Sequence, residues 1–167
     1  MSELFTFITD PSTTNRQIHE RLSASVPADV ADILDDLDRR NIVRVFRLLS
    51  KTMAADVFSY LSQELQEYLL EVLTDKEIAG VVNEMFFDDA VDMVEELPAN
   101  LVSRMLKNAS DATRAAINAL LQYPDGSAGS IMTTEYISLA EGLSVAQAFE
   151  RIRRTGTDTE TIYTCYV

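Results

Sequence analysis

PADVADILDDL, at residues 27–37, carries the pattern that decides the fold. Its apolar residues recur three and four positions apart, as one face of an amphipathic helix requires. Similar sequences occur further along the chain, namely AADVFSYLS (54–62), KEIAGVVNEM (76–85) and DDAVDMVEEL (88–97). Four variants of one amphipathic motif predict an array of short helices and a mainly α fold.

The array has an internal period of about 24 residues. A 24-residue unit holds two helices of about ten residues, each roughly 15 Å long, and such helices are too short to be stable alone. We therefore expect residues 27–122 to form a right-handed superhelix of four short helical hairpins that stack on one another. Four columns of apolar residues mark the period: Leu34, Phe58, Val82, Leu106; Leu37, Leu61, Met85, Ala109; Val45, Leu69, Met93, Ile117; Leu49, Leu73, Leu97, Leu121.

Capping signals flank the array. Within STTNRQIHERLSAS (12–25) the sequence predicts a further helix, so residues 1–26 are expected to form a capping region. His19 in that helix is expected at the surface, because no other His or Cys lies near it in sequence. Inside the array, side chains that can accept from backbone N–H groups suggest helix N-caps at Asp38, Thr74, Asn100 and Ser110.

After residue 122 the composition and the hydrophobic pattern of the sequence change. YPDGSAGS (123–130) is rich in Pro and Gly and reads as a linker. Residues 131–167 then show a strand pattern, a helix that opens with a capping box at Ser144, and a second strand in TIYTCYV (161–167). A strand that buries Ile162, Tyr163, Cys165 and Val167 needs a sheet that the remaining residues barely provide, so we expect this β-α-β order to be the start of an α/β domain cut short.

Composition excludes several functions. The 167 residues carry a net charge of −13, which disfavours nucleic acids and anionic membrane surfaces, while 47% hydrophobic residues indicate a folded protein. No GxSxG, GxxxxGK[ST], GxGxxG or HExxH motif is present, so the chain is not expected to be an enzyme. No apolar run is long enough to span a membrane, so we expect no direct membrane insertion. The single cysteine fits a reducing cytosol.

The negative charge is concentrated in the middle of the chain. Between residues 52 and 103 there are twelve acids and one base, Lys76. In FFDDAVDMVEELP (86–98), Asp88, Asp92 and Glu95 fall within about 60° of one another on a helix. Carboxylates at this spacing, without bases near them in sequence, attract hard divalent cations such as Mg²⁺. A solvated acidic surface without a metal is the other interpretation, and helical periodicity does not separate the two.

LLQYPDGSAGSIMTTEYISL, at residues 120–139, closely resembles a junction in the MgtE family of bacterial magnesium channels, whose typical wording is LLxYPxxSAGxIMTxEY. The resemblance extends over about residues 20–167. It implies an acidic superhelical N domain, here 27–122, followed by the first part of a CBS domain. It also implies CBS and transmembrane pore domains as partners, a homodimer, and a location at the cytoplasmic face of the bacterial inner membrane.

The resemblance further implies that cytosolic Mg²⁺ binds between these domains and holds the channel closed. Carried over position by position, it suggests Asp88 and Asp92 as ligands. Asp56 stands where the family commonly has Glu, and Asp89 and Glu95 are adjacent candidates. The remaining family ligands would lie mostly beyond Val167, so Mg²⁺ is expected to bind weakly to this chain.

A second hypothesis stays open beside this one. Flagellar motor switch proteins use comparable arrays of short helices, and a metal-independent solenoid for protein interaction has the same 24-residue period. Within the sequence, only SAGSIMT and the β-α-β pattern after it favour the magnesium channel. Nucleotide binding by a CBS pair is likewise left open.

Overall fold

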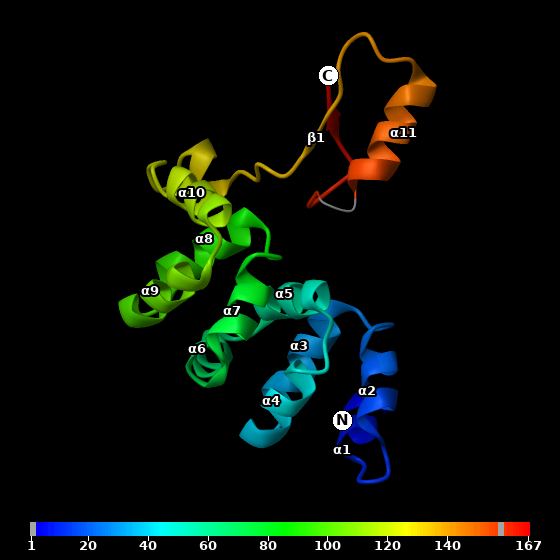
Figure 1. Cartoon of the computed structure of the whole chain (residues 1–167), viewed down its shortest axis with the longest axis vertical. Coiled ribbons are helices and arrows are strands. Elements are labelled where there is room, and N and C mark those ends of the chain that lie inside the picture. The colour runs from blue at the N-terminus through cyan, green and yellow to red at the C-terminus, as the bar shows by residue number, and fades with distance from the viewer. Residues whose placement is uncertain (1–2, 157–158) are drawn as a thin grey trace.

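The computed structural model describes residues 3–156 and 159–167. Over these residues the fold is mainly helical with one two-stranded parallel sheet, so the predicted fold class is confirmed (Figure 1). The elements are α1 (Glu3–Thr9), α2 (Asn15–Leu22), α3 (Pro27–Asp36), α4 (Arg39–Phe46), α5 (Lys51–Tyr60), α6 (Gln63–Val72), α7 (Asp75–Val82), α8 (Phe87–Glu96), α9 (Ala99–Asn108), α10 (Asp111–Leu120), η1 (Ala128–Ile131, 3₁₀), β1 (Ile137–Ser138), α11 (Val145–Thr155) and β2 (Cys165–Tyr166).

The 24-residue period governs where the helices begin. Helices α3, α5, α7 and α9 start at residues 27, 51, 75 and 99, and α4, α6, α8 and α10 start at 39, 63, 87 and 111. Thirteen of the sixteen column residues are buried. The other three, Leu49, Leu106 and Leu121, are half-buried and still pack against the core. The apolar columns therefore face inward because they are the only surface these short helices can bury.

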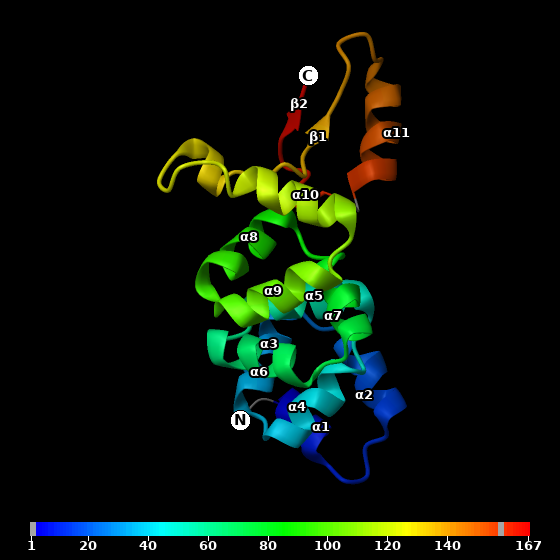
Figure 2. The same cartoon turned by 60° about the vertical axis from the view of Figure 1, so that its left-hand side comes forward.

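Contacts within the array run mainly between corresponding helices of successive units. Helix α3 packs on α5, α5 on α7, α7 on α9, and α8 on α10, whereas α3 and α4 of one unit share less contact. In Figure 2 the helices stack along the long axis, with α1 and β2 at opposite ends of the molecule. The stack is thus held together between units more than within each hairpin.

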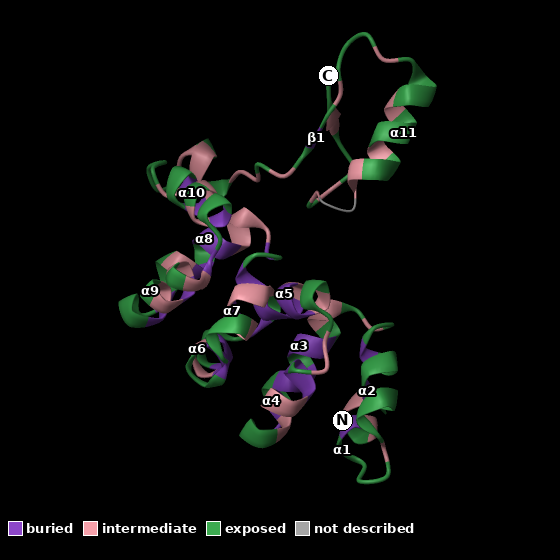
Figure 3. Cartoon of the chain, in the orientation of Figure 1, coloured by how far each residue is buried: buried purple, intermediate pink, exposed green. Residues whose placement is uncertain are grey.

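The buried residues form two clusters. The larger runs from Ile8 in α1 to Ala109 after α9, and the smaller joins α8 and α10 through Ala90, Val91, Ile117 and Leu120. Figure 3 shows the buried stripes on the inner sides of the array helices and exposed residues on their outer sides. Met132, two residues after the linker, packs on the smaller cluster, so the packing of the array continues into the residues that follow it.

The N-terminal cap has two helices, and the sequence patterns predicted only α2. Helix α1 covers the array with Ile8, which is 1% exposed. Two bonds tie the cap to the array: Arg44 Nη2 donates to the Ile8 carbonyl at 3.0 Å, and Nδ1 of the exposed His19 lies 2.6 Å from the Leu48 carbonyl oxygen. The helix α1 pattern was missed because seven residues are too few to show a clear helical period.

The N-cap predictions were correct at three of four positions. Asp38, Thr74 and Ser110 each accept a hydrogen bond from the first turn of their helix. The prediction at Asn100 is wrong, because Pro98 occupies the N-cap and Asn100 lies inside α9. Pro98 has no side-chain acceptor, so helix α9 begins without a side-chain cap.

The C-terminal segment, defined here as residues 131–156 and 159–167, has the predicted β-α-β order. Strands β1 and β2 pair in parallel, with Ile137 opposite Cys165. The last strand and the residues beside it are largely exposed. Tyr163 is 98% and Val167 81% exposed, Ile162 is exposed and Cys165 is half-buried. Two strands and one helix offer no second layer to cover that face.

The described helices also bear on membrane insertion. Among residues 3–156 and 159–167, no helix is both long enough and apolar enough to cross a bilayer.

Candidate metal site

The first turn of α8 places two carboxylates where the array meets the C-terminal segment. Asp88 and Asp89 are the second and third residues of this helix, and its N-cap, Phe86, contributes no side-chain hydrogen bond. Acidic side chains are favourable in a first turn because the backbone N–H groups there carry partial positive charge. The local sequence therefore tolerates a pair of adjacent acids at this point without bases nearby.

Four acids from three parts of the chain line one cleft, which we call the acidic cleft. Asp56 comes from α5, Asp88 and Asp89 from α8, and Glu160 from the C-terminal segment, with Ser59 and Tyr60 beside them. The cleft encloses a volume of about 450 Å³. Because a water molecule takes about 30 Å³ in the liquid, there is room for a cation with several of its waters.

Burial and neighbouring negative charges raise the pKa values of two carboxylates in the cleft, Asp88 and Asp56. Burial raises the pKa of Asp88 above its ordinary value, and the charges of Glu160 and Asp89 raise it further. Burial likewise raises the pKa of Asp56, with a contribution from Asp89. Within the described residues, Oδ1 of Asp88 is buried without a hydrogen-bond partner. A buried, unpartnered carboxylate oxygen is unfavourable, so the cleft favours anything that can supply positive charge or a donor.

Three acids elsewhere in the central stretch form ion pairs with arginines, which the local sequence did not indicate. Lys76 is the single base of that stretch, yet arginines from outside it reach its acids. The ion pairs are Arg39 with Glu64, Arg47 with Glu77 at 2.7 Å, and Arg104 with Asp75 at 3.0 Å. No ion pair among residues 3–156 and 159–167 includes an acid of the cleft. Within these residues, the negative charge of the cleft is therefore not neutralised by an arginine or a lysine.

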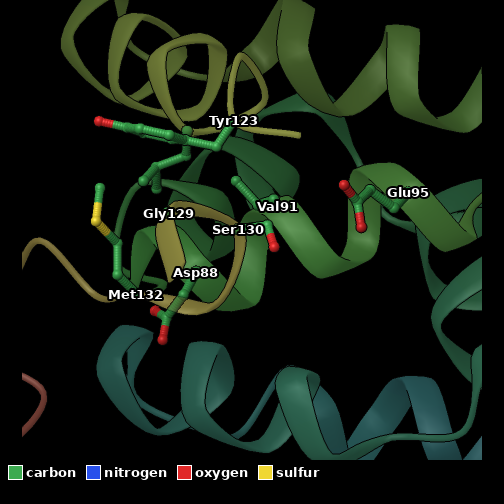
Figure 4. A pocket seen from close by; sticks show the side chains of 8 residues that line it. Asp88, Val91, Glu95, Tyr123, Gly129, Ser130 and Met132 are labelled. Carbon is green, nitrogen blue, oxygen red and sulfur yellow. The ribbon is translucent and has the colours of Figure 1, made fainter. Parts of the chain in front are cut away.

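The structure brings three of the five predicted ligands together and leaves two outside. Asp56, Asp88 and Asp89 line the acidic cleft. Asp92 is exposed and does not line it, although it follows Asp88 by one helical turn. Glu95 is also exposed and lies apart from Asp88 along α8, beside a small pocket under Tyr123 (Figure 4).

Two acids that sequence reasoning missed belong to the site. Glu160 lines the cleft, and Glu135, between the linker and β1, accepts a hydrogen bond from the Phe87 N–H at 2.7 Å. Burial raises the pKa of Glu135, with Asp88 adding to the shift and the Phe87 N–H opposing it. Glu135 lies in the TTEY motif of the junction (133–136), and this motif was the only feature of the sequence that could have pointed to it. No feature of the sequence pointed to Glu160.

The donor set suits a hard cation although it is not a finished cage. No three His, Cys, Asp or Glu side chains in the described parts of the chain are grouped tightly enough to hold a metal as they stand. All four acids of the cleft offer carboxylate oxygen, the donor that Mg²⁺ prefers, and Mg²⁺ keeps several waters while taking only one or two carboxylates. Among these oxygens, Oδ1 of Asp88 is buried and has no hydrogen-bond partner within the described residues.

Comparisons with known proteins cover both halves of the structure. The family described as the MgtE intracellular N domain matches residues 25–126. Magnesium transporter MgtE of Thermus thermophilus is 35% identical over 157 residues, covering 91% of this chain and 34% of that protein. The protein of the same name from Bacillus subtilis is 25% identical over 141 residues, covering 84% and 31%. The chain thus spans about one third of the length of these curated relatives.

Two crystal structures resemble the whole chain. One, described as the soluble part of a magnesium transporter, has a TM-score of 0.88 at 26% identity and covers 99% of this chain and 66% of that one. The other is the cytosolic domain of the Mg²⁺ channel MgtE in complex with ATP, with a TM-score of 0.77 at 34% identity, covering 92% and 63%. These relatives are named as transporters or a channel, and none of these names denotes an enzyme.

Proposed function

The chain belongs to the MgtE intracellular N domain family, and from this premise we propose that it is a cytosolic Mg²⁺-sensing region of a magnesium transporter. In this proposal the region binds Mg²⁺ in the acidic cleft and thereby helps to hold a channel closed. Its partners are a transmembrane pore and further regulatory domains of the same protein, in a homodimer at the cytoplasmic face of a bacterial inner membrane.

A single observation carries the proposal. The array contributes Asp56, Asp88 and Asp89 to one wall of the cleft, and the C-terminal segment contributes Glu160 to the other. A cation bound there would join two parts of the chain that are separated by the linker. Sensing needs such a joint, because a ligand shifts a conformational equilibrium only by binding one arrangement better than the other.

The carboxylates themselves supply the opposing force. Like charges face one another across the cleft, and within the described residues no arginine or lysine forms an ion pair with them. Their repulsion favours separation of the two walls. A bound divalent cation would neutralise this charge and give facing carboxylates a shared partner.

The size of the response follows from mass action. Mg²⁺ stabilises the closed arrangement by RT ln(1 + [L]/Kd), which is about 1.4 kcal/mol when the free ion is at ten times its Kd. Only a few carboxylates and one half-enclosed cleft hold the ion here, so the response is expected at millimolar concentrations.

The test is a Mg²⁺ titration of the chain, followed by small-angle scattering and thermal unfolding at constant ionic strength. We expect compaction and an increased melting temperature in the parent. Asp88→Asn combined with Asp89→Asn should abolish both changes. Potassium chloride at matched ionic strength should not reproduce them, because screening acts without a bound ion.

The repeat supplies a matched control. Asp32 stands 24 residues before Asp56, at the same position of α3 that Asp56 occupies in α5, but it is exposed and lies outside the cleft. Asp56→Asn should weaken the Mg²⁺ response, whereas Asp32→Asn should leave it unchanged. If the two variants respond alike, or if the Asp88/Asp89 variant responds as the parent does, Mg²⁺ sensing in this cleft is refuted and the metal-independent solenoid is favoured.

A further inference from the structure

Helix α8 has an incomplete N-terminus. Among array helices, α4, α5, α7 and α10 begin with a side chain that caps the first turn, whereas α3, α6, α8 and α9 do not. The N-cap of α8 is Phe86, which has no polar side-chain atom. The N–H of Phe87 is therefore one of the orphan donors that every helix start leaves. In this structure the donor is satisfied from a distant part of the chain.

The missing acceptor comes from Glu135. Its Oε2 accepts the Phe87 N–H at 2.7 Å across 48 residues of sequence, in a half-buried position. The same residue is fixed on its own side, because its N–H donates to Thr133 Oγ1 at 3.1 Å and its carbonyl accepts the Glu160 N–H at 3.1 Å. One residue thus links α8 with the backbone at Glu160, that is, both walls of the acidic cleft.

We propose that Glu135 is a positioning residue that docks the C-terminal segment on the array by capping α8 in place of the side chain that Phe86 lacks. In this role it sets where Glu160 stands relative to Asp88 and Asp89. It acts through the hydrogen bond to the Phe87 N–H and does not need to touch a metal ion.

The docking carries an electrostatic penalty. The carboxylate of Glu135 lies near Asp88, Asp89 and Glu160, and their charges oppose its own. Among the described residues, the Phe87 hydrogen bond and the positive end of α8 favour it there. Docking is therefore opposed by the same charges that a cation would neutralise. This consequence, unlike the docking itself, rests on the proposed magnesium sensing.

Substitutions at this position can separate hydrogen bonding from charge. Glu135→Gln keeps a side-chain oxygen that can accept the Phe87 N–H and removes the negative charge. Glu135→Ala removes both. Glu141→Ala is the matched control, because Glu141 is exposed in the same segment and none of the side-chain hydrogen bonds or ion pairs found among the described residues includes it.

The direct test is hydrogen exchange of the Phe87 amide, measured by NMR on the chain without Mg²⁺. In Glu135→Ala this amide should exchange roughly five to ten times faster, the scale of losing one helix cap. Exchange of buried amides in α5 should stay as in the parent, which shows that the fold is kept. Glu135→Gln and Glu141→Ala should protect Phe87 as the parent does.

A second readout is the Mg²⁺ concentration at half-maximal compaction. It should rise in Glu135→Ala, because the segment is no longer held in register. It should fall or stay unchanged in Glu135→Gln, where the cap remains and the repulsion is reduced. A purely ligating role for Glu135 predicts that both variants need more Mg²⁺.

The results bear separately on the two proposals. Unchanged Phe87 exchange in Glu135→Ala, or equal loss of protection in Glu135→Ala and Glu135→Gln, overturns the capping role whether or not the chain responds to Mg²⁺. Should the parent fail to respond to Mg²⁺ while Phe87 behaves as expected, the docking role stands and the sensing function fails.

Discussion

Asp88 lies 24 residues after Glu64, at the same second position of its helix, yet only Glu64 is paired with a cation. The partner of Glu64 is Arg39, the first residue of α4. One repeat later the corresponding first residue is Gln63, whose amide donates instead to the Glu96 carbonyl and to Glu67. The repeat thus places an arginine, Arg39, 25 residues before Glu64 and a neutral glutamine, Gln63, at the same distance before Asp88.

Gln63→Arg should supply the missing partner. By the repeat, an arginine there would stand to Asp88 as Arg39 stands to Glu64, so we expect the two side chains to pair; partly exposed pairs contribute about 0.2–1 kcal/mol. We expect a small increase in stability without Mg²⁺ and a smaller increase on adding it, measured by urea unfolding with and without the ion.

Gln63→Met separates charge from the loss of the amide. It removes the hydrogen bonds to Glu96 and Glu67 but adds no cation, so its Mg²⁺ response should match that of the parent. An undiminished response in Gln63→Arg would contradict the role given to Asp88.

Glu77 gives the array a defined pH dependence. Hydrogen bonding from Arg47 lowers the pKa of Glu77 from 4.5 to about 2, opposed by partial burial and assisted by Thr74. Since the pKa is lower in the folded state, the ionised carboxylate stabilises the fold above its ordinary pKa, and this contribution is lost as the pH falls toward 2.

Glu77→Gln tests that dependence, because the amide oxygen can still accept from the Thr74 cap. The variant should be less stable than the parent near neutral pH by on the order of 1 kcal/mol, since both partners are partly exposed. The difference should shrink between pH about 5 and about 2 in urea unfolding followed by circular dichroism. A difference that is constant with pH would show that the lost charge is not the cause.

Gly129 lies directly beside the ring of Tyr123 (Figure 4). A Cβ at residue 129 would overlap the Tyr123 ring atoms, so Gly129→Ala must displace the ring or the linker. We expect a loss of about 1–3 kcal/mol in the free energy of unfolding.

The Tyr123→Ala/Gly129→Ala double variant should recover part of that loss, because the ring that causes the overlap is gone. Chemical denaturation of the two single variants and the double variant gives the coupling energy. Additive losses would place the cause elsewhere than in this contact.

Gly80 should behave in the opposite way. It lies inside α7, and an added Cβ would have no atom within 4 Å. Glycine inside a helix costs about 0.5–1 kcal/mol relative to alanine, so Gly80→Ala should stabilise the chain by about that amount in thermal or urea unfolding. Destabilisation would indicate that residue 80 packs against something in solution.

The array could be predicted from sequence in detail, and the segment after it only in the order of its strands and helix. Columns such as Leu34, Phe58 and Val82 repeat at a fixed spacing, and burial of a helix face follows directly from that spacing. Ile162 and Tyr163 read equally as a buried strand, but burial there depends on a second layer that two strands and one helix do not provide.

The candidate site, too, could be predicted only in part from the sequence. Asp56, Asp88 and Asp89 were predicted from the acidic phrases and the family resemblance, and the structure places them in one cleft, although their binding of Mg²⁺ stays a prediction. Asp92 shares a helix face with Asp88 yet remains outside the cleft, because α5 and the C-terminal segment enclose only the first turn of α8.

The sequence by itself determined the helical array, its 24-residue period and the excess of acid in its middle, because these are properties of residues close together in the chain. Only the tertiary structure decided which acids are neutralised and which are not. Arg47 reaches Glu77 across 30 residues, and Glu135 reaches Phe87 across 48. Such contacts depend on how the helices stack and where the linker returns the chain, and no local spacing encodes either.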